Sequence, residues 1–208
     1  MRSRLKTSSL GLAVAVCVTM PTMPILAESS LEEIIVTAQK REESILDVPI
    51  SIAVLGGEEL ASARFASVND AIRTTPGVYS YDSFQGGGTK FSVRGVTSNS
   101  SLFSGSSTVG YYLDEIPFGF VKFPVTPDAN AYDLERVEVL RGPQGTLYGA
   151  NALNGVIRIL TNDAELSEFD ASFRASAAGT REGAPSYRGD LMVNVPLVPD
   201  KLAVRATV

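Results

Sequence analysis

The hydrophobic pattern of the first third of the chain predicts one short strand followed by two short helices. The run V-P-I-S-I-A-V-L at 48–55 is almost purely apolar and ends at two glycines, which predicts a buried strand. Glu58 and Glu59 follow, and acidic residues suit the positive end of a helix, so a helical turn is expected there. Ser67 is an expected N-cap, and the helix that it begins should stop before Pro76.

Short apolar stretches separated by polar loops continue to about residue 163. The loops are rich in Ser, Gly, Asn and Pro and carry scattered Tyr and Phe residues. Four further strands are predicted, at 90–96, 109–114, 137–140 and 155–161. A few short strands, two helices and long loops describe a small α+β domain over 47–163.

The pattern changes after Asp163. Three segments alternate roughly between apolar and polar residues and are joined by turn-rich stretches, at 169–177, 187–195 and 202–208. Alternating segments of roughly 9 to 11 residues are the weak signature of transmembrane β-barrel strands. Three strands cannot close, and open strand edges do not survive in lipid. We therefore expect 164–208 to be the start of a truncated barrel, in the N-terminal piece of a longer protein or in a truncated gene product.

One β-prone run stands alone near the N-terminus. The run I-I-V-T at 34–37 is four β-branched residues in a row, and charged residues crowd both of its flanks. The stretch 39–47 is mostly polar or charged, and no other β-prone run begins before Val48. The pattern predicts an isolated strand on a flexible tether over 28–46. An edge strand of the following domain is the alternative.

Residues 1–27 have the layout of a secretory signal peptide. Three bases precede an apolar run at 10–18, and small or helix-breaking residues lead to Ala27. The apolar run is shorter than the roughly 20 residues that a membrane-spanning helix needs. We predict that this segment is removed after export. An uncleaved amphipathic anchor is the alternative, although the run shows no polar face.

The composition excludes several classes of partner and of catalytic or metal site. The chain has 18 basic and 23 acidic residues, and loss of the leader leaves a net charge of −8, which argues against nucleic acid as a partner. Cys17, the only cysteine, lies in the leader, and the chain has no histidine. A Ser-His-Asp triad or an imidazole-bound zinc cannot be built from it. An enzyme that uses carboxylates remains as an alternative, but nothing selects a pair; we expect no catalytic residues, metal site or cofactor.

Several motifs, in order along residues 32–163, resemble the plug domain of TonB-dependent outer-membrane receptors. They are R-G at 94–95 after an alternating strand, Y-L-D-E-I-P at 112–117, L-E-R-V-E-V-L-R-G-P-Q-G-T-L-Y-G at 134–149 and N-G-V-I-R-I-L-T at 154–161. The block at 134–149 is highly specific. The chain departs from the family at Glu115, where glycine is usual, and in the turn A-N-A-L-N-G. The resemblance implies a small mixed sheet with flanking helices, followed by barrel strands.

The resemblance implies an outer-membrane receptor of a Gram-negative bacterium. Such a receptor takes up a scarce solute, for example an iron–siderophore complex or cobalamin, by partner-driven movement of the plug. The TonB box, which the energy-transducing protein TonB catches as an added strand, would be Glu33, Ile34, Ile35, Val36, Thr37 and Ala38. A periplasmic binding or signalling module with a plug-like fold is the alternative, although it has no use for three barrel-like strands.

The resemblance also implies ligand contacts on the outward loops of the plug. The matching positions are Arg94, Phe118, Gly119, Phe120 and Tyr132. Aromatic rings and arginine suit bulky, often anionic ligands. The alternatives are an internal ion pair for Arg94 and simple packing for the two phenylalanines.

Four charged residues in the specific block are candidates for an ion-pair group. They are Glu135, Arg136, Glu138 and Arg141. Such a group would stiffen the plug and help it to grip a barrel wall. Solvated charges that contribute little are the alternative.

Overall fold

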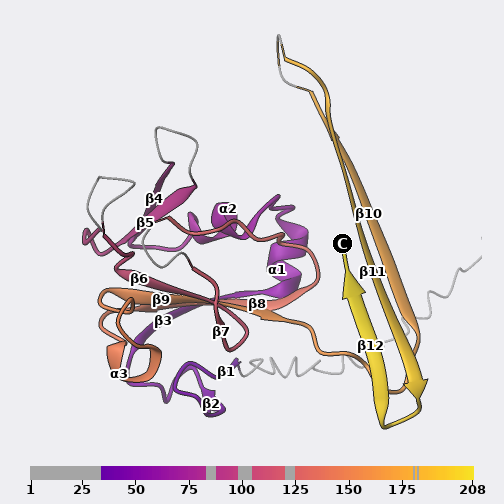
Figure 1. Cartoon of the computed structure of the whole chain (residues 1–208), viewed down its shortest axis with the longest axis horizontal. Helices are drawn as coiled ribbons and strands as arrows, with labels where there is room; N and C mark the ends of the chain where they lie inside the picture. Colours follow the sequence, from indigo (N-terminus) through magenta and orange to yellow (C-terminus); the bar gives the residue numbers. More distant parts are fainter. Residues whose placement is uncertain (1–33, 83–87, 98–104, 120–124, 180, 182) are drawn as a thin grey trace, which may run out of the picture. The chain divides into compact units, whose positions relative to one another are not determined.

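A five-stranded mixed sheet lies at the centre of the region that the computed structural model describes, residues 34–82, 88–97, 105–119, 125–179, 181 and 183–208 (Figure 1). Its strand order is β3-β8-β9-β6-β7. β6 runs parallel to β9, and the other neighbours are antiparallel. The expected α+β domain with a mixed sheet is therefore confirmed. The strands are β3 (Ser51–Gly56), β6 (Val109–Leu113), β7 (Ile116–Pro117), β8 (Leu134–Arg141) and β9 (Gly155–Thr161).

Two hydrophobic clusters cover opposite faces of this sheet, because successive residues of a strand point to opposite sides. Val137 and Ile157 belong to the cluster under the first two helices, whereas Leu140 and Val156 belong to the cluster on the other face. None of the helices in the described ranges is long and apolar enough to cross a membrane. The first face is covered by α1 (Gly57–Ser62), α2 (Val68–Ile72), β4 (Val78–Asp82) and β5 (Thr89–Val93), and the second by β1 (Ile35–Val36), β2 (Glu43–Ser44) and α3 (Gly145–Tyr148).

The C-terminal part forms a separate antiparallel sheet in the order β10-β11-β12. The middle strand extends beyond the segment predicted at 187–195, because Pro196 still lies in it, opposite Ala203. The register shifts between Pro196 and Val198, and such an irregularity accommodates the missing N–H of proline. The strands are β10 (Asp170–Ala178), β11 (Ser186–Val198) and β12 (Leu202–Thr207).

The local signals are confirmed at the second helix, whereas the short elements β2, β4, β7 and α3 were not predicted. The Ser67 side chain caps α2 by accepting a hydrogen bond from the Asp70 N–H at 3.3 Å, as predicted. The strand β4 lies partly in a stretch interpreted as a loop. Its sequence V-Y-S-Y-D alternates, and Val78 is buried against the core while Tyr79 is exposed.

Gly56 and Gly57 give a matched pair for testing how closely α1 packs on β8. A Cβ atom on Gly57 would lie 2.3 Å from the backbone oxygen of Leu134, whereas a Cβ on Gly56 meets nothing within 4 Å. We expect Gly57→Ala to lower the free energy of unfolding by about 1–3 kcal/mol through overpacking. Gly56→Ala should change it by less than about 0.5 kcal/mol. Urea unfolding of both variants measures the difference, and equal midpoints would contradict the close approach.

Candidate functional site

The N-terminal strand β1 is docked against the five-stranded sheet. It pairs with β2 in antiparallel register, with Val36 opposite Glu43. Val36 and Ala38 are both 0% exposed and pack in the cluster that contains Leu140. The strand that was expected to be isolated is therefore paired and packed in this structure. Two small apolar side chains fill space on the sheet, and this burial holds the segment in place.

The backbone of β1 is paired along one edge only. The Ile45 N–H donates to the Ile34 carbonyl oxygen at 2.9 Å. In an antiparallel ladder this places the N–H and C=O groups of Val36 toward β2 and those of Ile35 away from it. No described strand pairs along the second edge, because β1 and β2 form a two-stranded sheet by themselves. The Ile35 backbone is therefore the part of β1 that a further strand would meet.

A buried pair of opposite charges lies on the sheet face that β1 covers. Glu138 of β8 and Arg158 of β9 are cross-strand neighbours, and their side chains are 0% and 1% exposed. The Arg158 Nη1 donates to Glu138 Oε2 at 2.6 Å, and the Arg136 Nε donates to Glu138 Oε1 at 2.8 Å. Each buried charge therefore has a partner, which is the condition for keeping charges in a protein interior.

Thr37 joins β1 to this charged pair. Its backbone N–H donates to Glu138 Oε1 at 3.3 Å. Its hydroxyl oxygen accepts from Arg158 Nη1 at 2.9 Å and from Arg136 Nη2 at 3.3 Å. One residue further along, the carbonyl oxygen of Ala38 accepts from the Tyr148 hydroxyl at 2.7 Å. The segment is thus bound to the sheet by polar contacts as well as by burial.

Glu115 extends the charged cluster to the turn after β1. Its Oε1 accepts from Arg158 Nη2 at 2.9 Å, and its Oε2 forms an ion pair with Lys40. The hydrogen bond from Lys40, with the nearby positive charges of Lys40 and Arg158, lowers the pKa of the Glu115 carboxyl. Burial raises the pKa of the Tyr148 hydroxyl to about 12. Glu115 is therefore an anion and Tyr148 a neutral donor near neutral pH.

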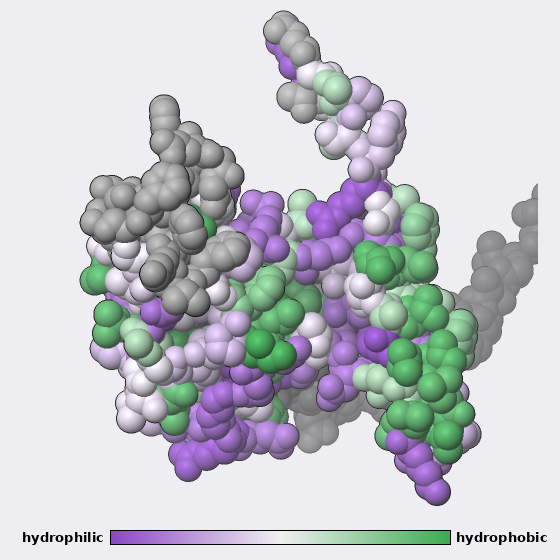
Figure 2. Space-filling view, viewed as in Figure 1, coloured by the Kyte–Doolittle hydropathy of each residue, from purple (hydrophilic) through white to green (hydrophobic). Residues whose placement is uncertain are grey.

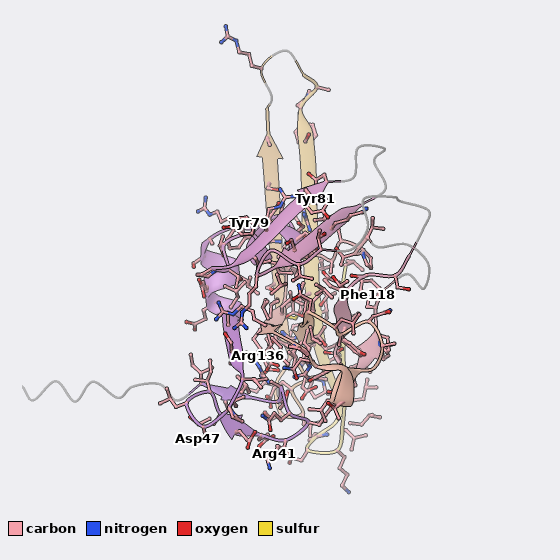
Figure 3. All side chains as sticks on the ribbon, turned by 90° about the vertical axis from the view of Figure 1, so that its left-hand side faces the viewer. Arg41, Asp47, Tyr79, Tyr81, Phe118 and Arg136 are labelled. Carbon is pink, nitrogen blue, oxygen red and sulfur yellow. The ribbon has the colours of Figure 1, made fainter. Side chains whose placement is uncertain are left out.

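An open cleft of 680 Å³ lies between this turn and the sheet. Lys40 lines it from the N-terminal segment, and Glu115, Arg158 and Asp163 line it from the plug. Figure 3 shows Arg41, which also lines the cleft, at the end of the plug opposite to Tyr79 and Tyr81. The charged cluster and the cleft belong to the end of the plug that carries β1.

Three of the four residues predicted to form an ion-pair group come together. Glu135, Arg136 and Glu138 are joined by ion pairs. Arg141 is not part of the group, and its Nη1 donates to the Pro76 carbonyl oxygen at 2.9 Å. It lies three positions after Glu138 on the same strand, so it points to the opposite face of the sheet.

The sequence interpretation missed Arg158, Glu115 and Lys40 as members of this cluster. One signal was available, because Arg158 is a single cation within the otherwise apolar run G-V-I-R-I-L. Glu138 is likewise a single anion between valines. The pairing register that sets these two residues opposite each other is a property of the sheet, and the sequence does not contain it directly.

The residues predicted to contact ligand do not form one cluster in the described region. Arg94 is exposed in a turn, with φ of 52° and its N–H donating to the Gly77 carbonyl oxygen at 2.9 Å. Phe118 is half-buried, and its ring stacks on Tyr111 with the ring centroids 6.1 Å apart. Gly119 is exposed. Phe120 lies outside the described residues, as does Glu33 of the predicted TonB box.

Tyr132 faces the C-terminal sheet. Its hydroxyl lies 2.7 Å from the Ser172 Oγ, and the Arg174 guanidinium lies 4.7 Å from its ring centroid. The sequence interpretation instead missed two exposed aromatic side chains on β4. Tyr79 and Tyr81, which Figure 3 labels, are 69% and 39% exposed, and their spacing of two residues places them on one face of that strand.

Comparisons with known proteins identify the family. A family model described as "TonB-dependent Receptor Plug Domain" matches residues 44–156, and the chain belongs to this family. The matched range begins after β1. The resemblance inferred from the motifs is therefore confirmed for the plug.

The relatives are much longer proteins. The chain is 31% identical over 144 residues to "Vitamin B12 transporter BtuB" of Vibrio vulnificus (strain CMCP6), covering 66% of this chain and 22% of that protein. It is 30% identical over 171 residues to "Pesticin receptor" of Yersinia enterocolitica, covering 82% of this chain and 23% of that protein. The chain thus spans less than a quarter of the length of these relatives.

Solved structures show the same fold. The ferric yersiniabactin uptake receptor FyuA from Yersinia pestis superposes with a TM-score of 0.54 at 27% identity, covering 71% of this chain and 22% of that chain. The ferripyoverdine receptor of the outer membrane of Pseudomonas aeruginosa superposes with a TM-score of 0.61 at 23% identity, covering 79% of this chain and 20% of that chain.

Proposed function

We propose that this chain is the plug-bearing part of an outer-membrane receptor that takes up a scarce solute by energy-dependent movement of the plug. The observation that carries the proposal is β1, a strand docked on a plug-family domain with one edge unpaired. The relatives named as a vitamin B12 transporter and a ferric yersiniabactin uptake receptor support cobalamin or an iron–siderophore complex as the class of solute. No step of this function requires covalent chemistry.

The partner in this proposal is the energy-transducing protein TonB, which would add a strand to β1. In such β-augmentation the backbone supplies the hydrogen bonds and exposed side chains supply selectivity. Ile35 presents its N–H and C=O away from β2, and Ile34 and Ile35 are 46% and 43% exposed. Residues 34–38, with Glu33 before them, are therefore our proposed partner-binding segment.

The C-terminal sheet supports the placement in the outer membrane. Along β11, the exposed Leu191 and Val195 alternate with the buried Asp190, Met192 and Asn194. Figure 2 shows that apolar surface gathers over the region of β11 and β12. A free periplasmic module would leave this apolar face in water, which is costly. We propose that 1–27 direct export and that β10, β11 and β12 are the first strands of a membrane barrel.

The solute would meet the end of the plug opposite to β1. Arg94 is exposed in the turn that follows β5, and the exposed aromatic residues Tyr79 and Tyr81 lie on the paired strand β4. A guanidinium with aromatic rings suits a bulky anionic chelate through stacking and charge-assisted hydrogen bonds. Phe118 to Phe120 remain candidate contacts from the sequence interpretation, whereas the contacts of Tyr132 with β10 favour a role in joining the plug to that strand.

Deletion of the gene that carries this chain tests the proposal. We expect the cells to lose both surface binding and energy-dependent accumulation of one labelled solute from a panel of ferric siderophores and cobalamin. The full-length gene should restore both activities, whereas a gene lacking codons 34–38 should restore binding alone. Accumulation restored by the deletion variant would place energy coupling outside β1, and unchanged uptake of every solute would contradict the receptor function.

A further inference from the structure

Glu115 occupies a position between the N-terminal segment and the buried charge of the sheet. One of its carboxylate oxygens binds Lys40, which belongs to the turn after β1, and the other binds Arg158. Arg158 in turn donates to the hydroxyl of Thr37, at the end of β1. Glu115 and Arg158 thus bind the N-terminal segment at two places, Lys40 and Thr37.

We propose that Glu115 and Arg158 are positioning residues that form a latch, which sets how often β1 undocks from the sheet. The energy-coupling role of β1 rests on the proposed function. The latch itself consists of the contacts that Lys40 and Thr37 make, and its effect on the docking of β1 can be tested without any partner.

The arrangement suits reversible release because the buried charges keep partners when the segment leaves. Without Thr37 and Lys40, Arg158 still pairs with Glu138 and Glu115, and Glu138 still pairs with Arg136. No uncompensated buried charge is therefore created, and such a charge is what makes the breaking of most buried ion pairs expensive. Release is opposed by two effects. It exposes the apolar side chains of Val36 and Ala38 to water, and it breaks the polar contacts of Thr37, Ala38 and Lys40.

The accessible half of the latch is the pair between Lys40 and Glu115. The side chain of Glu115 is 59% exposed and that of Lys40 is 38% exposed, whereas that of Arg158 is 1% exposed. Both residues of the exposed pair line the open cleft, so water and salt reach it. The latch therefore combines a part-buried hydrogen bond at Thr37 with a salt-sensitive ion pair at Lys40.

Thiol alkylation measures release directly. Cys17 is the only cysteine, so the full chain with Cys17→Ser and Val36→Cys carries a single thiol at a position that is 0% exposed. At low salt, adding Glu115→Gln should accelerate alkylation of that thiol about fivefold, the ratio that corresponds to one exposed ion pair. About 1 M NaCl should accelerate alkylation with Glu115 present and have little effect in the Glu115→Gln background.

Matched controls separate the latch from a general loss of stability. Asp163→Asn removes the same charge from the same cleft, where no described hydrogen bond or ion pair joins Asp163 to residues 34–46, and it should leave the rate unchanged. A thiol introduced by Val68→Cys, buried on the other face of the sheet, should not respond to Glu115→Gln.

Equal alkylation rates with Glu115 present and in the Glu115→Gln background would overturn the latch, as would an equal acceleration at both buried thiols. Faster alkylation only at residue 36 supports it, whatever the transport result. If release accelerates as expected while uptake in the full-length receptor does not depend on residues 34–38, the latch stands and the proposed energy-coupling role of β1 is wrong.

Discussion

Replacing Ile35 with proline in the full-length receptor should lower the rate of energy-dependent uptake at least about tenfold, while solute binding stays unchanged. The Ile35 N–H points away from β2, so proline there removes the donor offered to a partner strand. Proline is tolerated on a strand edge whose N–H is not used by the sheet, so the plug should keep its fold. The lost hydrogen bond contributes only about 1 kcal/mol, and steric exclusion of the partner strand by the ring adds to it.

Ile35→Ala is the matched control, because it keeps the N–H and an extended backbone. Val36→Pro is a poor test of the same idea. The Val36 N–H is directed to β2 and its side chain is buried, so that variant would disturb the docking of β1 itself. Whole-cell binding and accumulation of the labelled solute give the result. Normal accumulation in Ile35→Pro, or loss of binding with it, would show that β1 is a structural strand only.

Arg158→Met should be the most destabilising single change in the charged cluster. It leaves the carboxylate of Glu138 at 0% exposure with Arg136 as its remaining cation. Removal of one partner of a buried ion pair costs about 3–5 kcal/mol, and we expect the lower end of that range because Arg136 remains. Arg41→Met is the control, since its ion pair with Glu43 is exposed on the arginine side and should contribute no more than about 1 kcal/mol.

Urea unfolding of the purified chain measures both variants, together with the double variant Arg158→Met, Glu138→Leu. The double variant should be more stable than Arg158→Met alone, because it removes the unpaired charge and replaces it with an apolar side chain. If Arg158→Met and Arg41→Met have the same free energy of unfolding, the charge on Arg158 is not a determinant of plug stability.

The sequence by itself determined the order and the type of most elements. The apolar runs predicted β3, β5, β6, β8 and β9, and the cap of α2 was predicted at Ser67, because these features depend on residues a few positions apart. The block at 134–149 was sufficient to indicate the family, which the family comparison then confirmed. The alternation after residue 169 likewise predicted three strands close to β10, β11 and β12.

Tertiary structure decided how the N-terminal strand is held and which charges meet. The sequence suggested that the run at 34–37 was isolated, but its partners are distant along the chain, since Thr37 and Glu138 are 101 positions apart. The same holds for Glu115 with Arg158, which are 43 positions apart. Local patterns fix periodicity, whereas strand register and the docking of β1 depend on contacts that exist only when the sheet has formed.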